Sequence, residues 1–222
     1  MFLSRFEFNT ARRGARHLLA SPQRLHAAVL AAFPRTIEHA VPGQGRVLWR
    51  LDQPPHRALL YLLSPHEPDL THLVEEAGWP ATHTWDTRDY APLLDRLATG
   101  QRYAFRLTAN PTFSRSTETD TRTRGRRLGH VTATQQTDWL LARTERHGFT
   151  VADTEFKEPD LALTSRTTHK FKREGHDVTI ATATFNGTLT VTDPATLRHA
   201  LTHGIGPAKG YGCGLLTLAP AT

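Results

Sequence analysis

The spacing of apolar residues predicts short strands and helices in the first half of the chain. Residues 2–8 alternate apolar with polar side chains, which is the period of a half-buried strand. A helix then starts at Ser21-Pro22, because serine suits the N-cap and proline suits the first helical position, and Pro34 ends it. Its buried stripe recurs at three- and four-residue steps: Leu25, Ala28, Val29, Ala32 and Phe33. Arg12, Arg13 and Arg16 precede it in an expected loop.

The same patterns continue into a second half, after an expected connector at 86–100. The remaining predicted strands are 46–51, 58–63, one near Trp85, 103–107, 149–151, 161–164, 178–191 and 215–218. The remaining predicted helices are 70–77, 135–147 and 194–203. Asn186-Gly187 is a frequent type I′ hairpin dipeptide, so we expect it to interrupt strand 178–191.

These elements predict the fold class. Strand and helix order in the first half is βαββαβ, the ferredoxin-like unit. We therefore predict an α+β protein of two tandem ferredoxin-like (RRM-like) domains with antiparallel sheets, residues 1–90 and 100–222.

Composition narrows the class of protein and its partners. The net charge of +6 and the pI near 10.0 favour an acidic partner such as nucleic acid or an anionic membrane. No apolar run is long enough to span a bilayer and no charged leader precedes one, so we expect a cytoplasmic protein. The single cysteine, Cys213, excludes an internal disulfide and a cysteine-based zinc site. The histidines show no ligand spacing such as H-E-x-x-H, so we predict no metal and no cofactor.

A glycine-rich stretch near the C-terminus, residues 204–214, has five glycines in eleven residues. Between them stand one cation, Lys209, and one aromatic residue, Tyr211. Backbone N–H groups in such a loop can hold a phosphate, although glycine-rich turns often only shape a loop. The stretch matches neither the Walker nor the Rossmann pattern, so a nucleotide cofactor is not expected. We interpret Gly206, Gly210 and Gly212, with Lys209, as docking residues for a phosphate backbone.

Four blocks of sequence, in the expected order, resemble one protein family. They are residues 1–5, 103–111, 185–191 and 204–220, which begin with Met1-Phe2-Leu3, Tyr103-Ala104-Phe105, Phe185-Asn186-Gly187 and Gly204-Ile205-Gly206. This pattern resembles the CRISPR repeat-RNA endoribonucleases of type I-E systems, the CasE family of the RAMP superfamily. The resemblance implies two ferredoxin-like halves, binding of a repeat RNA hairpin, cleavage at its 3′ base, and retention in the guide complex called Cascade.

The resemblance also points to a catalytic histidine. On a helical wheel, His26 lies at the edge of the buried stripe, which fits either a catalytic group or a packed structural histidine. CasE enzymes carry their histidine on the first helix, typically in a Tyr-x-x-His motif, and here that stretch is Gln23-Arg24-Leu25-His26. The tyrosine is therefore replaced by Gln23, and the basic residue that some members have one turn on is replaced by Ala27 or Ala31. Gln23, Arg24 and Lys209 are auxiliary candidates, and His17 is a fallback for His26.

Two basic segments are candidates for RNA binding. The first contains Arg115, Arg122, Arg124, Arg126 and Arg127, and the second contains Arg166, Lys170, Lys172 and Arg173 around an expected turn at Glu174-Gly175. Arginine pairs with phosphate oxygens in bidentate fashion, and a basic hairpin suits an A-form stem. Both segments can equally be solvated faces.

The chemistry expected from these residues is metal-independent RNA cleavage. A ribose 2′-OH attacks the neighbouring phosphorus, histidine moves a proton as acid or base, and the products are a 2′,3′-cyclic phosphate and a 5′-OH. The alternative is an RNA-hairpin-binding subunit of a CRISPR ribonucleoprotein without catalysis, which the absent tyrosine favours.

Overall fold

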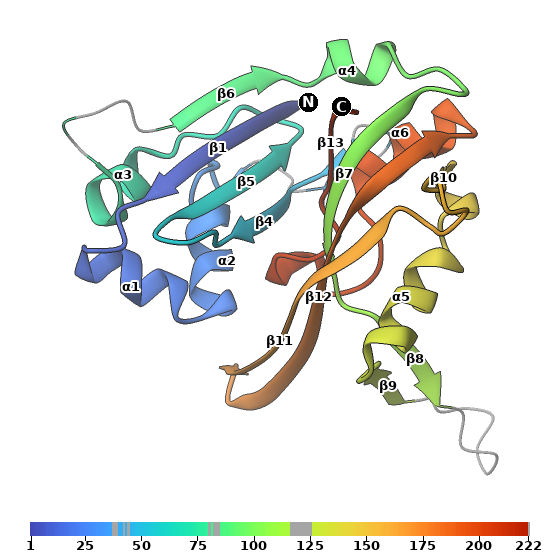
Figure 1. The fold of residues 1–222 in the computed structure, drawn as a ribbon. Coiled ribbons are helices and arrows are strands. Elements are labelled where there is room, and N and C mark those ends of the chain that lie inside the picture. The colour runs from blue at the N-terminus through green and yellow to red at the C-terminus, as the bar shows by residue number, and fades with distance from the viewer. Residues whose placement is uncertain are drawn as a thin grey trace.

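The computed structural model describes residues 1–36, 40–41, 43, 45–79, 81, 85–115 and 126–221 of the chain. It shows two antiparallel sheets side by side, each with its own helices, and a long hairpin that extends away from both chain termini (Figure 1). The predicted α+β class with antiparallel sheets is confirmed.

The first sheet contains β1 (Phe2–Phe8), β4 (Leu48–Asp52), β5 (Ala58–Ser64) and β6 (Trp85–Asp89), in the order β4-β5-β1-β6. Its pairings are all antiparallel, and the order is that of a ferredoxin-like sheet. Three helices belong to this half: α1 (Arg13–Leu19), α2 (Pro22–Leu30) and α3 (Thr71–Ala77). Two short strands, β2 (Ala40–Val41) and β3 (Gly45–Arg46), pair with each other before β4.

The second sheet repeats this order as β10-β12-β7-β13. Its strands are β7 (Arg102–Ala109), β10 (Phe149–Val151), β12 (His176–Val191) and β13 (Leu216–Pro220), and β11 (Leu161–Arg173) pairs with β12 as the long hairpin. Its helices are α5 (Ala133–Leu141) and α6 (Pro194–His203), with one-turn 3₁₀ helices η1 (Glu145–His147) and η2 (Lys209–Tyr211). Strands β8 (Thr112–Arg115) and β9 (Arg126–Gly129) form a second hairpin.

Successive side chains of a strand point to opposite faces of the sheet, and both faces of the first sheet are buried. On one face, Phe6, Leu60 and Leu62 pack with residues of α1, α2 and α3. On the other face, Leu48 and Leu63 belong to the core of the second half, with Leu107 and Leu201. The two halves therefore share one apolar core at their boundary.

The predicted loop holds for Arg12, which lies just before helix α1, but was wrong for Arg13 and Arg16, because Arg13–Leu19 is helix α1. The guanidinium of Arg12 donates to the carbonyls of Val74, Glu75 and Gly78 at 2.5–3.3 Å, and so satisfies carbonyls at the end of α3. Gly14 permits the close approach of α1 to α3, since a Cβ there would lie 2.3 Å from the Glu76 carbonyl oxygen.

The predicted turn at Asn186-Gly187 was also wrong, because β12 runs through it without interruption. Gly187 pairs with Phe105 and Leu161, and a Cβ there would lie 2.2 Å from the Asp160 carbonyl oxygen. This glycine is thus required by a close backbone approach. The hairpin turn lies at Glu174-Gly175, as expected, where both φ angles are positive, at 50° and 81°.

The expected connector at 86–100 is also ordered structure. Strand β6 extends to Asp89, and α4 (Ala91–Asp95) follows it. Leu94 joins the shared core, and its carbonyl accepts two hydrogen bonds from Arg198 of α6. The segment between the halves is consequently packed against the second one.

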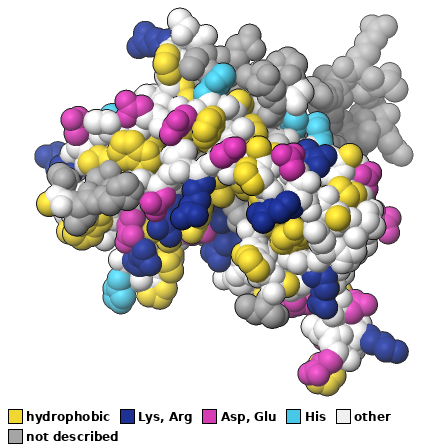
Figure 2. All heavy atoms as spheres, turned by 90° about the horizontal axis from the view of Figure 1, so that it is seen from above, with side chains coloured by type: hydrophobic (Ala, Val, Ile, Leu, Met, Phe, Trp, Pro, Cys, Tyr) yellow, Lys and Arg dark blue, Asp and Glu magenta, His cyan; other side chains and the backbone are white. Residues whose placement is uncertain are grey.

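The face near the chain termini is of mixed charge. Figure 2 shows Lys and Arg side chains interspersed with Asp and Glu on this face. No described helix is long and apolar enough to cross a membrane.

A buried ion pair joins the two sheets. Arg50, on the inward face of β4, donates from Nε and Nη2 to the Asp52 carboxylate at 2.8 and 3.0 Å, and its side chain is only 2% exposed. Its Nη1 donates across the boundary to the carbonyls of Arg106 and Leu215 and to Oγ1 of Thr217, at 2.8–3.2 Å. Arg106 also donates to Asp52 at 3.1 Å. One arginine thus bonds simultaneously to β4, β7 and the start of β13.

We expect Arg50→Ala to lower the free energy of unfolding by about 3–5 kcal/mol, because it removes one partner of a buried pair and leaves carbonyls unsatisfied. Urea denaturation followed by circular dichroism measures the change. Arg57→Ala is the matched control, since Arg57 forms an exposed ion pair with Glu7 and its loss should leave the midpoint nearly unchanged. An Arg50→Ala curve that overlays the wild-type curve would contradict this role.

Candidate functional site

His26 lies where the two halves meet, on α2 and half-buried. Its imidazole faces the glycine-rich loop of the second half: a Cβ on Gly210 would lie 3.3 Å from His26 Cε1 and 3.5 Å from Nε2. The ring of Tyr211 is 5.8 Å from the His26 ring, at 59° between planes. The structure therefore brings together the predicted histidine and the predicted loop, which are far apart in the sequence.

The glycines of the loop are explained by close packing. A Cβ on Gly212 would lie 2.7 Å from the Trp49 ring, and a Cβ on Gly206 would lie 2.8 Å from the Trp139 ring. Both have positive φ angles, 79° and 82°, which favour glycine. The loop is closed by hydrogen bonds from Ile205 N to the Gly214 carbonyl and from Gly214 N to the Thr108 carbonyl. Its path across α2 is therefore fixed by its neighbours.

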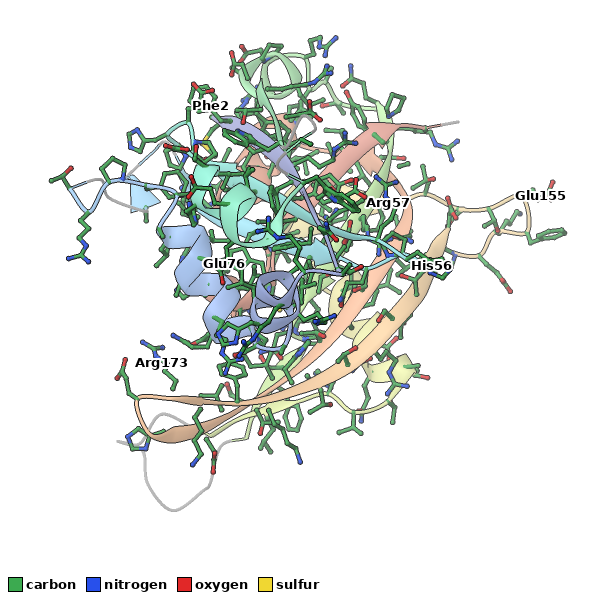
Figure 3. The ribbon with its side chains drawn as sticks, turned by 90° about the vertical axis from the view of Figure 1, so that its left-hand side faces the viewer. Phe2, His56, Arg57, Glu76, Glu155 and Arg173 are labelled. Atoms are coloured by element: carbon green, nitrogen blue, oxygen red, sulfur yellow. The ribbon has the colours of Figure 1, made fainter. Side chains whose placement is uncertain are left out.

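The long hairpin reaches the same place through Tyr211. The Phe171 ring of β11 is 4.9 Å from the Tyr211 ring. Arg173 forms an ion pair with Glu174 at 3.4 Å, and its interactions with Tyr211 and then with Glu174 raise the pKa of Arg173. Figure 3 shows Arg173 at the end of the hairpin, on the side of helix α2. Tyr211 thus links the hairpin to His26.

The other candidates on the first helices are placed less favourably. Gln23 lies one turn before His26, and its Oε1 is buried without a hydrogen-bond partner among the described residues. Arg24 is exposed and donates to the His17 carbonyl at 3.3 Å, so its guanidinium turns toward α1. His17 is exposed on α1, whereas we expected it to lie before the first helix.

Two pockets border α2 and the loop, and the smaller one contains His26. The smaller, of about 120 Å³, is lined by His26, Arg46 and Gly210, with Trp49 and three other residues. The larger, of about 220 Å³, lies between α2, the hairpin and the loop, and is rich in hydroxyl groups. Its polar lining includes Ser21, Ser165, Thr167, His169, Thr182, Thr184 and Tyr211. Trp49 lines both pockets, and no sequence pattern indicates that Arg46 or Trp49 would be near His26.

Lys209 is close to these groups. Burial, and then the charge of Arg46, lower the pKa of Lys209. On its other side, Lys209 lines a hollow of about 470 Å³ with Gly206, Arg143 and Arg146. The sequence did not indicate these two arginines. They place further positive charge beside the glycine loop.

The basic residues predicted to bind RNA are not equivalent. Arg166 is engaged within the protein, because Nε donates to Gln136 Oε1 at 2.9 Å and Nη2 donates to the Val131 carbonyl. Lys170 and Lys172 are exposed on β11 and share one face of it, whereas Phe171 and Arg173 share the other, toward Tyr211. Arg115, Arg126 and Arg127 contribute their backbone to the β8–β9 hairpin, and Arg122 and Arg124 lie outside the described residues.

Together these groups fit phosphoryl-transfer chemistry. A histidine can exchange a proton near neutral pH, and Arg46 lines the same pocket as His26 and places positive charge there, with Lys209 close to Arg46. The hairpin offers exposed cations to a polyanion at the edge of the same site.

Comparison with known proteins identifies relatives over the whole chain. A family model described as "CRISPR associated protein" matches residues 1–220. The CRISPR-associated endoribonuclease Cse3 of Thermus thermophilus is 31% identical over 230 residues, covering 99% of this chain and 100% of the relative. The Cascade subunit CasE of Escherichia coli is 48% identical over 50 residues, which are 22% of this chain and 25% of the relative.

A solved structure is also similar throughout. It is CRISPR endoribonuclease Cse3 bound to a 19-nucleotide RNA, with a TM-score of 0.82 and 30% identity. The match covers 99% of this chain and all of that one.

We expect Gly210→Ala to slow the RNA cleavage that the sequence predicts by about tenfold, because a methyl group there forces the His26 imidazole to shift by a few tenths of an ångström. Single-turnover rates at saturating protein measure the effect. Gly129→Ala is a sterically matched control on β9, where the new Cβ would lie 3.2 Å from the Ala181 Cβ. Equal rates for the two variants would show that the loop does not set the position of the imidazole.

Proposed function

The chain belongs to the family of CRISPR-associated endoribonucleases that includes Cse3 and CasE, and on this premise we propose how it acts. It is an endoribonuclease that binds CRISPR repeat RNA and operates with the other subunits of Cascade. We propose that it binds the stem-loop of the repeat transcript, cuts at the 3′ base of the stem by a metal-independent reaction, and keeps the product in Cascade.

The placement of His26 is the observation that carries this proposal. His26 is the one residue that the sequence motif, the helix position and the contact with the glycine loop all select. It is half-buried at the boundary of the two halves and lines a pocket that it shares with the cationic side chain of Arg46. A histidine that served only packing would not need a neighbouring surface of positive charge.

The reaction balances without water or a second reactant. A base removes the proton from the 2′-OH, the 2′ oxygen bonds to phosphorus, and the bond from phosphorus to the 5′ oxygen breaks. An acid supplies a proton to that departing oxygen. The products are a 2′,3′-cyclic phosphate and a 5′-OH, and His26 serves as either the acid or the base.

The RNA stem would lie along the long hairpin. Lys170 and Lys172 are exposed there and available to phosphates. Arg173 lies next to the hairpin turn and interacts with Tyr211 of the glycine loop. The basic segment of residues 115–127 would add Arg115, Arg122, Arg124, Arg126 and Arg127. Arg166 would act indirectly, by anchoring β11 to the start of α5. Gly206, Gly210 and Gly212 would shape the loop that presents Lys209.

Gln23 favours one alternative. A subunit without the family tyrosine could bind the hairpin and leave it uncut, since a glutamine side chain does not titrate near neutral pH. Incubation with labelled repeat RNA separates the two functions, because a binder shifts the RNA without shortening it.

We also propose residues 1–90 and 100–222 as the two domains and the cytoplasm as the site of action. The shared core and the Arg50 network imply that the two domains fold as one cooperative unit.

We expect His26→Ala to lower the single-turnover cleavage rate by about 10²- to 10⁴-fold, because one general acid or base is removed. The wild-type enzyme should cut in EDTA and leave a 2′,3′-cyclic phosphate, which mass spectrometry of the product ends detects. His66→Ala, in the turn after β5, is the control histidine and should retain the full rate. A 5′-phosphate product, or strict dependence on Mg²⁺, would replace this mechanism by metal-assisted hydrolysis.

We expect Lys170→Ala combined with Lys172→Ala to weaken RNA binding and to flatten its salt dependence by about one unit of slope for each phosphate that the protein no longer neutralises. Binding isotherms between low and moderate salt give the slope. Arg88→Ala combined with Arg96→Ala removes the same net charge from exposed residues of β6 and the end of α4, and should change neither quantity. Unchanged RNA binding by the lysine variant would show that Lys170 and Lys172 form a solvated face and do not contact RNA.

A further inference from the structure

The proposed reaction, on which the following inference rests, requires positive charge at the scissile phosphate. Attack by the 2′ oxygen produces a phosphorane with more negative charge on its nonbridging oxygens than the starting diester has. Helix α2 supplies no cation after His26, because Ala27 and Ala31 follow it. Arg24, before it, is committed to the His17 carbonyl. The charge must therefore come from another element.

Arg46 is positioned to supply it. It lies on β3 and lines the same pocket of about 120 Å³ as His26 and Gly210. The Nε atom of Arg46 is buried and has no hydrogen-bond partner among the described residues. The indole N–H of Trp49, which lines the same pocket, is buried without a described partner as well. A buried donor that is left unsatisfied costs free energy, so two such donors in one pocket indicate that an acceptor is missing.

The electrostatic surroundings identify the missing acceptor as an anion. Burial and then the charge of Arg46 lower the pKa of Lys209, and burial, then His199, and to a smaller extent Lys209 and Arg46, lower the pKa of His203. Among the described residues, neither Arg46 nor Lys209 forms an ion pair with a carboxylate. Like charges gathered in this way destabilise the free protein and are relieved when a phosphate binds between them.

The backbone holds Arg46 firmly in this place. Gly45 precedes it with a φ of 109°, and a Cβ on Gly45 would lie 2.9 Å from the Thr202 carbonyl oxygen of α6. Val47 follows it and is buried in the core of the first half. The arginine is thus fixed between α6 of the second half and the core of the first.

We propose that Arg46 is a catalytic residue, whose guanidinium binds a nonbridging oxygen of the scissile phosphate beside His26 and stabilises the phosphorane. Lys209 is the neighbouring cation of the same subsite, whose ligand is a phosphodiester of RNA. This arrangement supplies, from β3 and the glycine loop, the charge that α2 does not provide.

The test compares Arg46→Ala, Arg46→Gln and Arg46→Lys in single-turnover cleavage of repeat RNA at saturating protein. The alanine and glutamine variants should be slower by about 10²- to 10³-fold, and the lysine variant should lie between them and the wild type, because it keeps the charge but not the fork of donors. Affinity for RNA with a single 2′-deoxy at the cleaved linkage should stay within about threefold, since the interaction removed strengthens mainly in the transition state. Added guanidinium ion should restore part of the rate to Arg46→Ala and none to His26→Ala. Arg88→Ala is the control for removal of one exposed arginine.

Two results would overturn the proposal. One is an Arg46→Ala or Arg46→Gln variant that cleaves at the wild-type rate. The other is a reduction in rate that disappears at saturating protein, which would make Arg46 a binding residue only. If Arg46→Ala does not fold, the glutamine and lysine variants decide, since both retain most of the side-chain volume. Wild-type cleavage in EDTA is measured in parallel, so that failure of the proposed function is recognised separately from failure of the role given to Arg46.

Discussion

The buried hydrogen-bond network of Arg50 is the constraint on which the arrangement of this molecule depends. An ion pair taken out of water contributes little net stability, because desolvation offsets most of the attraction. What it does provide is geometry: five donors in a planar fork accept only one disposition of their acceptors. Here those acceptors come from β4, β7 and the residues that follow the glycine loop. The two sheets are therefore fixed in one relative position, and the loop is held at its C-terminal end.

From that fixed end the glycine loop is shaped by the side chains it crosses. Gly212 lies against the Trp49 ring, Gly206 against the Trp139 ring and Gly210 against the His26 imidazole. A Cβ on Gly212 or Gly206 would overlap a tryptophan ring, and one on Gly210 would require the His26 imidazole to shift slightly, so the glycine pattern reflects close packing of the loop against its neighbours. The chemistry of the loop resides in the residues between the glycines. Lys209 and Tyr211 reach α2 because the glycines allow the backbone to come so close.

The sequence predicted regular elements well, because their signals are local. Alternation identified β1, and helix 194–203 matched α6 at both ends, with Asp193 as N-cap and Pro194 in the first turn. The failures were residues whose role is set by distant neighbours. Gly187 was taken as a turn residue, whereas the Asp160 backbone approaches it, and Arg13 and Arg16 were placed in a loop, whereas they belong to α1, whose Gly14 packs closely against α3.

The candidate site shows the same division between local and distant signals. His26 and the loop could be predicted, since one lies on an amphipathic helix and the other is a contiguous motif. Their contact could not, because it depends on how the halves pack. Arg46 belongs to a strand of two residues and is followed by Val47 and Leu48, so in the sequence it is indistinguishable from an ordinary strand arginine.

Distribution of the charged groups over both halves has a physical consequence for this enzyme. A site built on one helix keeps its geometry as long as that helix is folded. In this chain, His26 comes from α2, Arg46 from the short strand wedged against α6, and Lys209 from the loop of the second half. Electrostatic stabilisation falls steeply once the donors are misplaced, whereas attraction of exposed lysines for a polyanion is long-ranged and tolerant. Loosening the boundary between the halves should therefore impair cleavage well before it impairs binding of RNA by the hairpin. The Arg50 network, which sets that boundary, is in this sense part of the catalytic apparatus although it touches no substrate.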